Sequence, residues 1–364
     1  MKRAVIVQAK RTPIGKENGM LKTLQPHELA APLLRQLSKG IEEEVDDVIL
    51  GNVVGPGGNV ARLSALEAGL PYNVPGMTID RQCSAGLEAV RIACYSIQGG
   101  AGRCYIAGGV ESASTSAFET RARFSPDHIG DPDMPMAAEY VAKKYSISRE
   151  KQDKYALRSY ERTREAFQTG IYNQEILAIN NMDTDEELLR DRNMERLLNR
   201  ARPIFANENG TVTAANSCGI HDGACAVLVM EETMAKQQGY QPVLRFIDSQ
   251  VSGVHPHFPG IAPVPAILQL LKRNELTMGD ISFVEINEAF ASKVVACEEE
   301  LSIPYEKLNV SGGALTLGHP YGASGAVLIT RLFYEVKKNR QAKYVLAAIG
   351  SGGGVGVAML FEKV

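Results

Sequence analysis

The sequence lacks the features that mark several large classes of protein. It contains no run of 18 consecutive apolar residues, so we expect no membrane-spanning helix. Its six cysteines include no C-x-x-C pair, which argues against a zinc site. The net charge is only −3, which argues against a nucleic-acid or anionic-membrane partner. We therefore expect a protein without a bound metal, a membrane or a nucleic acid.

An export signal is also lacking. The chain begins MKRAVIVQAKRTPIG, and Gln8 and Lys10 interrupt its apolar run without a small-residue cleavage site following. We expect this segment to form a strand, the protein to be cytoplasmic, and its thiols to stay reduced.

The composition is that of a globular protein, and its 364 residues suit two or three domains. Apolar runs, typical of strands buried on both faces, predict strands at 3–9, 46–54, 103–110, 224–230, 281–286, 344–350 and 355–361. Helical patterns lie between them at 27–40, 84–100, 287–303 and 322–338. This alternation predicts an α/β protein in which helices cover the sheets.

Two distant segments resemble each other. Residues 83–111 and 322–353 each run from a small-residue turn through a helix to a strand that ends in glycines. The polar stretch between the two halves has helical periodicity but few strand signals. We predict two related α/β halves, residues 1–114 (with 219–241 returning to it) and 242–364, and an inserted, mostly helical domain at 115–218.

Cys83 lies where an extended run turns into a helix, in IDRQCSAGLEAV. If the helix begins at Ser84, the partial positive charge of its N-terminus would lower the pKa of the Cys83 thiol and favour a nucleophilic thiolate. A lone cysteine is more often a small buried hydrophobe, so this position by itself leaves both interpretations open.

His319 and Asn287 are further candidates. His319, in GGALTLGHPYGASG, lies between Gly318 and Pro320 on a rigid turn that fixes where its imidazole points, as a general base requires. A surface-turn histidine remains the alternative. Asn287, in INEAF, follows an apolar strand, and it could be a plain helix N-cap or could hold a water or a substrate carbonyl.

The glycine run GSGGGVG at 350–356 follows a buried strand. Its free N–H groups could bind an anion or a developing oxyanion. The run is not a dinucleotide-binding fingerprint, because the chain ends before an acidic residue could follow at the required distance. A cysteine, a histidine and two candidate oxyanion sites together indicate acyl transfer through a thioester.

RQCSAGLEAV, NEAF, GGALTLGHPYGASG and the terminal glycine run, in this order, resemble the thiolase family, which comprises acetyl-CoA acetyltransferases and 3-ketoacyl-CoA thiolases. RTPIGKENG, GNVVGPGGNVAR and GTVTAANSCGIHDGA extend the resemblance along essentially the whole chain. It implies a duplicated αβαβα layered fold with an inserted loop domain that binds coenzyme A. It also implies a homodimer, acyl-CoA and CoA as substrates, no other cofactor, and a place in fatty acid metabolism.

The resemblance also implies roles for single residues. Cys83 would be the acylated nucleophile and His319 its base. His319 and a water held by Asn287 would form one oxyanion hole, and the backbone amides of Cys83 and Gly352 would form a second. Three more residues would contribute to substrate binding: Cys218, Met134 and Phe290.

This sequence departs from the thiolase pattern at the second catalytic cysteine, which serves as acid/base. Gly350 stands at its usual position, and Ala289 stands where a related subgroup carries it. Loss of a positioned acid/base typically costs about 10²- to 10⁴-fold in rate. The segments at 111–139 and near 180–202 are also shorter than usual, which favours a dimer over a loop-mediated tetramer.

Three functions therefore remain open. The first is a thiolase-type acyltransferase that forms a Cys83 thioester. The second is a thiolase-like protein that binds or relays CoA esters without making carbon–carbon bonds, as the glycine at position 350 suggests. The third is a decarboxylating or ketoacyl-synthase-like enzyme, which a single thiol would suit.

Overall fold

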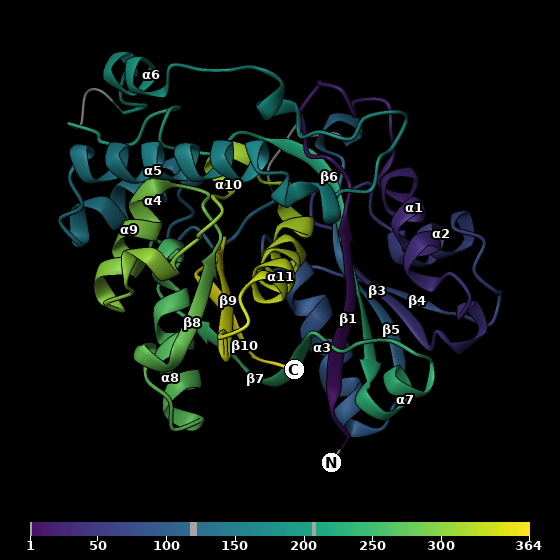
Figure 1. The fold of residues 1–364 in the computed structure, drawn as a ribbon. Coiled ribbons are helices and arrows are strands. Elements are labelled where there is room, and N and C mark those ends of the chain that lie inside the picture. The colour runs from purple at the N-terminus through teal and green to yellow at the C-terminus, as the bar shows by residue number, and fades with distance from the viewer. Residues whose placement is uncertain (1, 117–121, 206–208) are drawn as a thin grey trace.

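The computed structural model describes residues 2–116, 122–205 and 209–364 (Figure 1). Its strands are β1 (Ala4–Arg11), β2 (Gly15–Lys16), β3 (Asp47–Gly51), β4 (Gly76–Ile79), β5 (Cys104–Glu111), β6 (His221–Glu231), β7 (Leu244–Gly253), β8 (Ile281–Ile286), β9 (Tyr344–Ser351) and β10 (Val355–Lys363). All seven predicted strands are present. The analysis missed β2, β4 and β7, which are short or rich in polar residues.

The helices lie between these strands along the chain. They are α1 (Pro26–Ser38), α2 (Val60–Glu67), α3 (Ala85–Gly99), α4 (Met134–Lys144), α5 (Arg149–Gln168), α6 (Met194–Arg200), α7 (Glu232–Gln237), α8 (Pro263–Arg273), α9 (Ala291–Glu300), α10 (Ala314–Leu317) and α11 (Tyr321–Lys338). The helix predicted at 287–303 is shorter than expected, because the chain turns through residues 287–290 before α9 begins.

The strands are hydrogen-bonded in the order β4-β3-β5-β6-β1-β7-β10-β9-β8, with β2 beside β6. The link between β1 and β7 is narrow, since only Val5 and Ile6 pair across it. On either side of this link the same arrangement occurs. β1-β6-β5-β3 and β7-β10-β9-β8 each contain two antiparallel pairs and one parallel pair. The strand pairing therefore shows the duplication that the sequence pattern predicts.

Helices α3 and α11 lie between the two halves of the sheet (Figure 1). They cross at the small residues that open each helix. A side chain at Gly86 would collide with the Gly322 carbonyl oxygen, and one at Gly325 would collide with the Leu87 backbone nitrogen. The S-A-G and A-S-G steps therefore let the two helix N-termini, which carry the candidate site, approach closely.

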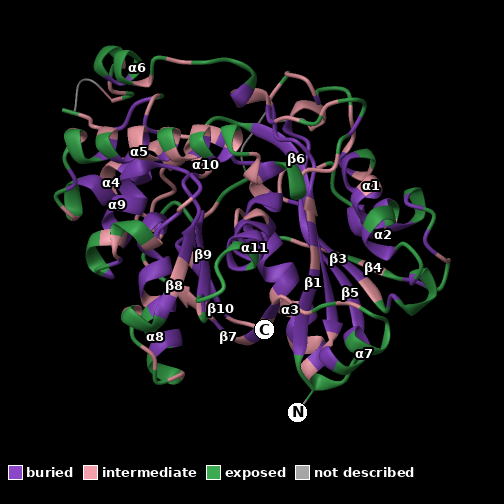
Figure 2. Ribbon diagram, in the orientation of Figure 1, coloured by how far each residue is buried: buried purple, intermediate pink, exposed green. Residues whose placement is uncertain are grey.

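Three apolar cores separate the layers, and buried residues fill the centre of the molecule (Figure 2). The central core joins α3 and α11 to both halves of the sheet. The second lies under α1 and α2, and the third lies around α8 and α9. The result is the layered αβαβα arrangement of the prediction. No helix of the described residues is long and apolar enough to cross a membrane.

The described residues between β5 and β6 contain helices α4, α5 and α6 and isolated bridges but no longer strand. Helices α4 and α5 pack against α9. Parts of this segment, residues 117–121 and 206–208, lie outside the described residues.

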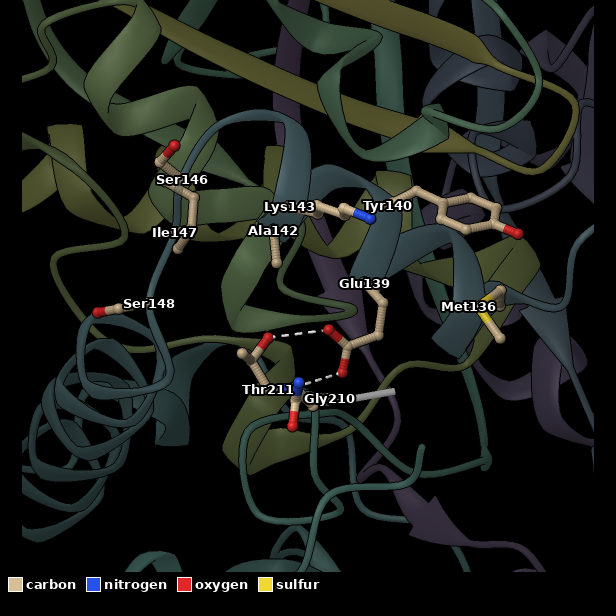
Figure 3. A pocket seen from close by; sticks show the side chains of 11 residues that line it. Met136, Glu139, Tyr140, Ala142, Lys143, Ser146, Ile147, Ser148, Gly210 and Thr211 are labelled. Atoms are coloured by element: carbon tan, nitrogen blue, oxygen red, sulfur yellow. Dashed lines mark hydrogen bonds between the residues drawn. The ribbon is translucent and has the colours of Figure 1, made fainter. Parts of the chain in front are cut away.

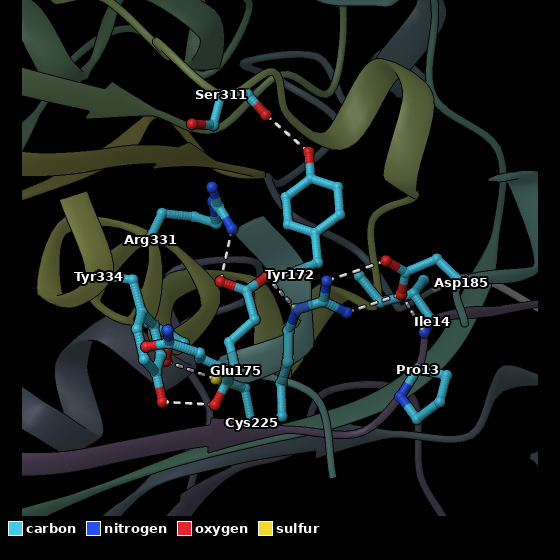
Figure 4. Close-up of polar contacts among 12 residues, drawn as sticks. Pro13, Ile14, Tyr172, Glu175, Asp185, Cys225, Ser311, Arg331 and Tyr334 are labelled. Carbon is cyan, nitrogen blue, oxygen red and sulfur yellow. Dashed lines mark hydrogen bonds and ion pairs between the residues drawn. The ribbon is translucent and has the colours of Figure 1, made fainter. Parts of the chain in front are cut away.

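A buried ion network fixes this segment to the sheet (Figure 4). Nε of Arg11, on β1, donates to Glu175 at 2.7 Å, and its two terminal nitrogens donate to the Asp185 carboxylate at 2.6 and 2.8 Å. Arg331 of α11 contacts the other Glu175 oxygen. The two guanidinium groups keep the pKa of Glu175 low despite its burial. One β-strand, the loop-domain residues and the helix after His319 are thereby held in a single arrangement.

Candidate active site

Cys83 lies in a tight turn directly before α3. Gln82 has a positive φ of 51°, and its backbone N–H donates to Asp80 Oδ1 at 2.6 Å. Helix α3 then begins at Ala85, with Ser84 as its N-cap. The sequence prediction that Cys83 precedes the first helical turn is therefore confirmed, and the residue as a whole is half-buried.

The expected thiolate is not supported. Burial raises the pKa of the Cys83 thiol to about 11, the positive charge of Lys293 opposes this shift, and the carboxylates of Glu111 and Asp80 add to it. Loss of hydration outweighs the helix N-terminus on which the prediction rested. Cys83 is therefore a neutral thiol near neutral pH, and a base must remove its proton before it can attack.

His319 is the candidate for that base. Its Nδ1 is 2.6 Å from Ser324 Oγ on α11, whereas Nε2 is buried and has no partner among the described residues. If Nδ1 carries the proton, Nε2 is a free acceptor. Burial, reinforced by the charges of Lys293 and His221, lowers the pKa of His319 to about 3, so the ring stays neutral.

The turn before His319 depends on a second histidine. The His319 backbone N–H donates to Nδ1 of the buried His221 at 3.3 Å. Gly318 has a φ of +112°, and a side chain there would collide with the His221 ring. His221 therefore positions the GHP turn. The sequence analysis overlooked His221, although its place in the thiolase-like segment SCGIHDGA was a usable signal.

Asn287 is not a helix N-cap, because α9 begins four residues later and has Phe290 at its N-cap. Its backbone N–H donates to Ala348 on β9 at 3.2 Å. Its side-chain Nδ2 is buried without a partner among the described residues. A buried amide left unpaired at the end of a strand is suited to a water or a substrate carbonyl, which was the second interpretation of this residue.

Glu288 locks the turn that presents Asn287. Its carboxylate accepts hydrogen bonds from Tyr155 at 2.7 Å, Ser159 at 2.7 Å and Asn309 at 3.0 Å. Two of these donors come from α5, so the loop domain helps to position the NEAF segment. The unpaired Asn287 thus stands beside a fully paired neighbour.

Gly352 is joined to the Cys83 turn by two serines. The Ser84 backbone N–H donates to Ser351 Oγ at 2.9 Å, and the two hydroxyls contact each other. This contact holds the turn of Cys83 next to the end of β9, where Gly352 follows Ser351. Because Ser351 is buried and its hydroxyl is already hydrogen-bonded to Ser84, that hydroxyl has a structural role.

Lys293 was missed by the sequence analysis. It lies in the first turn of α9, is 2 % exposed, and donates from Nζ to the Gly350 carbonyl oxygen at 3.2 Å. Burial lowers its pKa, and the nearby thiols of Cys83, Cys297 and Cys218 oppose this shift. Helical periodicity was the available signal, since positions 289, 290, 296 and 297 on the same face are all apolar.

The three residues expected to bind substrate lie together. Met134, Cys218 and Phe290 belong to one apolar cluster with Ala138, Val212 and Ala289. The Cys218 backbone N–H donates to the Ala289 carbonyl at 2.9 Å. This cluster joins the loop domain to the NEAF segment and gives the site an apolar wall.

A cavity of about 460 Å³ opens beside His221 and Ser217. Arg192, Arg200 and Glu187 also line it, and Arg192 forms an ion pair with Glu187. A larger hollow of about 740 Å³ lies between α4 and the Gly210–Thr211 segment (Figure 3). None of the candidate catalytic residues lines that second hollow.

Comparison with known proteins supports the family assignment. Residues 4–233 match the thiolase N-terminal domain, and residues 240–363 match the thiolase C-terminal domain. The chain belongs to the thiolase family. It is 61 % identical over 359 residues to "Putative acetyl-CoA C-acetyltransferase YhfS" of Bacillus subtilis, and the match covers 99 % of both chains.

Two further relatives span the whole chain. A Staphylococcus aureus protein, "Putative acetyl-CoA C-acetyltransferase VraB", is 48 % identical over 385 residues, covering 100 % of each chain. The crystal structure of the Bacillus anthracis acetyl-CoA acetyltransferase superposes with a TM-score of 0.92 at 36 % identity, covering 100 % of this chain and 99 % of that one. The fold and the thiolase type of acyltransferase therefore agree with the sequence prediction.

Proposed function

We propose that this thiolase-type acyltransferase moves acyl groups to and from coenzyme A through a thioester on Cys83. The observation that carries the proposal is a neutral thiol in a site where a base nitrogen, His319 Nε2, and an amide, Asn287 Nδ2, are buried without partners. Because neither atom has a hydrogen-bond partner among the described residues, each is available to a substrate or a water.

In the proposed acylation, His319 Nε2 takes the proton of Cys83, and the thiolate attacks the thioester carbonyl carbon of an acyl-CoA. The oxyanion that forms is stabilised by His319 and a water on Asn287, or by the amides of Cys83 and Gly352. The bond from carbon to the CoA sulfur then breaks. The departing CoA thiolate recovers the proton from the imidazolium, which leaves an acyl group on Cys83.

The substrates we propose are acetyl-CoA and 3-ketoacyl-CoA, used in condensation or thiolysis, with a place in fatty acid metabolism. Support comes from the names of the relatives and from the cavity that leads away from His221. Its apolar lining suits a pantetheine arm, with Met134, Cys218 and Phe290 nearby. Arg192 and Arg200 suit phosphates.

We also propose the organisation inferred from the sequence. Residues 1–114, with 219–241, would form one half, 242–364 the other, and 115–218 a CoA-binding loop domain. A cytoplasmic homodimer is proposed as the assembly. The edge strand β4 supports the dimer, because it lacks a neighbour on one side among the described residues and has exposed Tyr72 and Met77 close by.

A coupled assay tests the proposal. Purified protein would be given acetoacetyl-CoA, or a longer 3-ketoacyl-CoA, together with free CoA, while intact-protein mass spectrometry follows Cys83. We expect turnover and an acyl adduct that maps to Cys83. Absence of the adduct with every acyl-CoA would contradict the thioester. An adduct without turnover would favour the second candidate, a protein that relays CoA esters without cleaving carbon–carbon bonds.

A further inference from the structure

Neighbouring atoms occupy the space that a cysteine side chain at position 350 would need in this protein. A side chain at Gly350 would collide with the carbonyl oxygen of Pro259 and would lie 3.0 Å from the ring of Pro263. Both belong to the segment that leads into α8, which packs against β9 and β10. A cysteine therefore does not fit at position 350 of this backbone, and another group must move the proton if carbon–carbon bonds are made or broken.

Lys293, which packs beside Gly260 of the same segment, reaches the backbone of position 350. Its Nζ lies 3.2 Å from the carbonyl oxygen of Gly350, so the amine lies next to the residue that replaces the thiol. Among the described residues, no carboxylate forms an ion pair with Lys293. A buried ammonium without a counter-ion is unfavourable, and buried ionisable groups of this kind are frequent at functional sites.

The other titratable groups that face Lys293 are those of the site. Its charge acts on Cys83 and on His319, and the thiols of Cys218 and Cys297 also interact with it. Burial lowers the pKa of Lys293, because an ammonium group loses its hydration there, and this favours the neutral amine over the charged one. An amine of this kind can accept a proton and return it, as lysines with lowered pKa do in other general-base roles.

We propose that Lys293 is the catalytic acid/base at the α-carbon of the acyl-CoA, in place of the second cysteine. This inference rests on the proposed Cys83 thioester. Lys293 acts in the second half-reaction, in which the carbon–carbon bond forms or breaks, whereas His319 takes the proton of Cys83 when an acyl-CoA acylates it.

The proton balance is closed without any further reagent. In condensation, neutral Lys293 takes a proton from the α-carbon of an acyl-CoA, and the resulting enolate carbon attacks the carbonyl carbon of the acyl-Cys83 thioester. The new carbon–carbon bond forms, the carbon–sulfur bond to Cys83 breaks, and the thiolate receives the proton from the Lys293 ammonium. Thiolysis is the reverse, with the ammonium protonating the enolate that leaves.

The test separates the two half-reactions in Lys293→Gln and Lys293→Met. The first half is the rate at which an acyl-CoA labels Cys83, followed by intact-protein mass spectrometry. The second half is followed by deuterium uptake into the α-carbon of acetyl-CoA in D₂O and by thiolysis of acetoacetyl-CoA. We expect both second-half rates to fall by about 10²- to 10⁴-fold, while Cys83 labelling stays close to that of the wild type.

The matched control is Lys307→Gln. Lys307 also donates from Nζ to a backbone carbonyl, that of Gly279 at 3.0 Å, but it lies on the surface away from the site. All variants are checked by thermal unfolding. Both Lys293 variants should fold, because they remove a buried charge that has no carboxylate partner.

Each result decides the proposal. A Lys293→Gln enzyme that retains thiolysis and deuterium uptake overturns it. Equal loss of Cys83 labelling and of thiolysis also overturns it, because Lys293 would then be needed already for the acylation of Cys83. A wild-type enzyme that labels Cys83 but neither exchanges deuterium nor turns over refutes the lysine assignment alone. A wild-type enzyme that never labels Cys83 refutes the proposed function itself.

Discussion

Two buried polar regions of this protein treat their charged groups in opposite ways. In the network around Arg11, the guanidinium donates to Glu175 and makes two bonds to Asp185, and these three bonds join chain segments far apart in sequence. At the candidate active site, His319 Nε2 and Asn287 Nδ2 have no partner among the described residues, and Lys293 has only a carbonyl.

This difference separates groups that hold the fold from groups that perform chemistry. A buried charge with all its hydrogen bonds made is fixed in one protonation state and one position. A buried group with an unmade bond is available to bind a substrate or to exchange a proton, at a cost in stability. Substitutions should therefore affect stability in the first region and turnover in the second.

The largest effect is expected for Cys83→Ala, which removes the nucleophile. Turnover should fall by a factor on the order of 10⁴ to 10⁶, with the fold retained. Thiolysis and acyl labelling measure this. Cys94→Ala is the matched control, because Cys94 lies farther along α3 within the central apolar core. Substantial activity in Cys83→Ala would end the thioester mechanism.

Arg11→Met should destabilise the fold by removing the centre of the buried ion network. It leaves the carboxylates of Glu175 and Asp185 buried without their main partner, and removal of one member of such a pair costs about 3–5 kcal/mol. Urea unfolding at a fixed protein concentration measures the loss.

The control for that substitution is Arg103→Met, whose ion pair with Glu231 lies at the surface. We expect about 0–1 kcal/mol there. An Arg11→Met protein as stable as the surface variant would show that the buried network contributes no stability, and the comparison between the two regions would fail.

Asn287→Ala and Asn309→Ala compare an unpaired amide with a paired one at the same end of β8. Asn287 has a free amide, so its loss should lower kcat by about 10²- to 10³-fold and leave the unfolding midpoint nearly unchanged. The Asn309 amide donates to Tyr155, Ile286 and Glu288, so its loss should cost about 1–3 kcal/mol of stability. Similar stability losses in both variants would remove the distinction between paired and unpaired amides.

The smallest effect is expected in the pH dependence of stability. The pKa of His319 is lowered to about 3, whereas an unfolded histidine titrates near 6.5. Below pH 6.5 the unfolded chain takes up a proton that the folded chain does not, so stability falls with pH until about 3. Between pH 6.5 and 5.5 the loss should be about 1 kcal/mol.

Chemical unfolding of the wild type and of His319→Gln at these two pH values measures that contribution as a difference. His128→Gln, which removes an exposed imidazole, is the control. An equal pH dependence in wild type and His319→Gln would mean that His319 is not held neutral in the folded protein.

Much of the fold could be predicted from the sequence because apolar runs and glycine breaks are local signals. β5, β8 and β9 lie within a few residues of their predicted bounds. β7 was missed because it alternates polar and apolar residues beside the narrow link to β1. The start of α9 was misplaced because the turn at Asn287 is held by side chains from α5, which no local pattern records.

The candidate site shows the same division. The sequence by itself determined which residues are candidates for chemistry, since Cys83, His319, Asn287 and Gly352 lie in recognisable turns, and it also showed that no cysteine stands at position 350. Only the tertiary structure decided their protonation and surroundings. Desolvation and the charges of distant residues depend on how the chain packs. Three features therefore become visible only in the folded chain: the raised pKa of Cys83, the hydrogen bond from Lys293 to Gly350, and the collision that a side chain at Gly350 would make with Pro259.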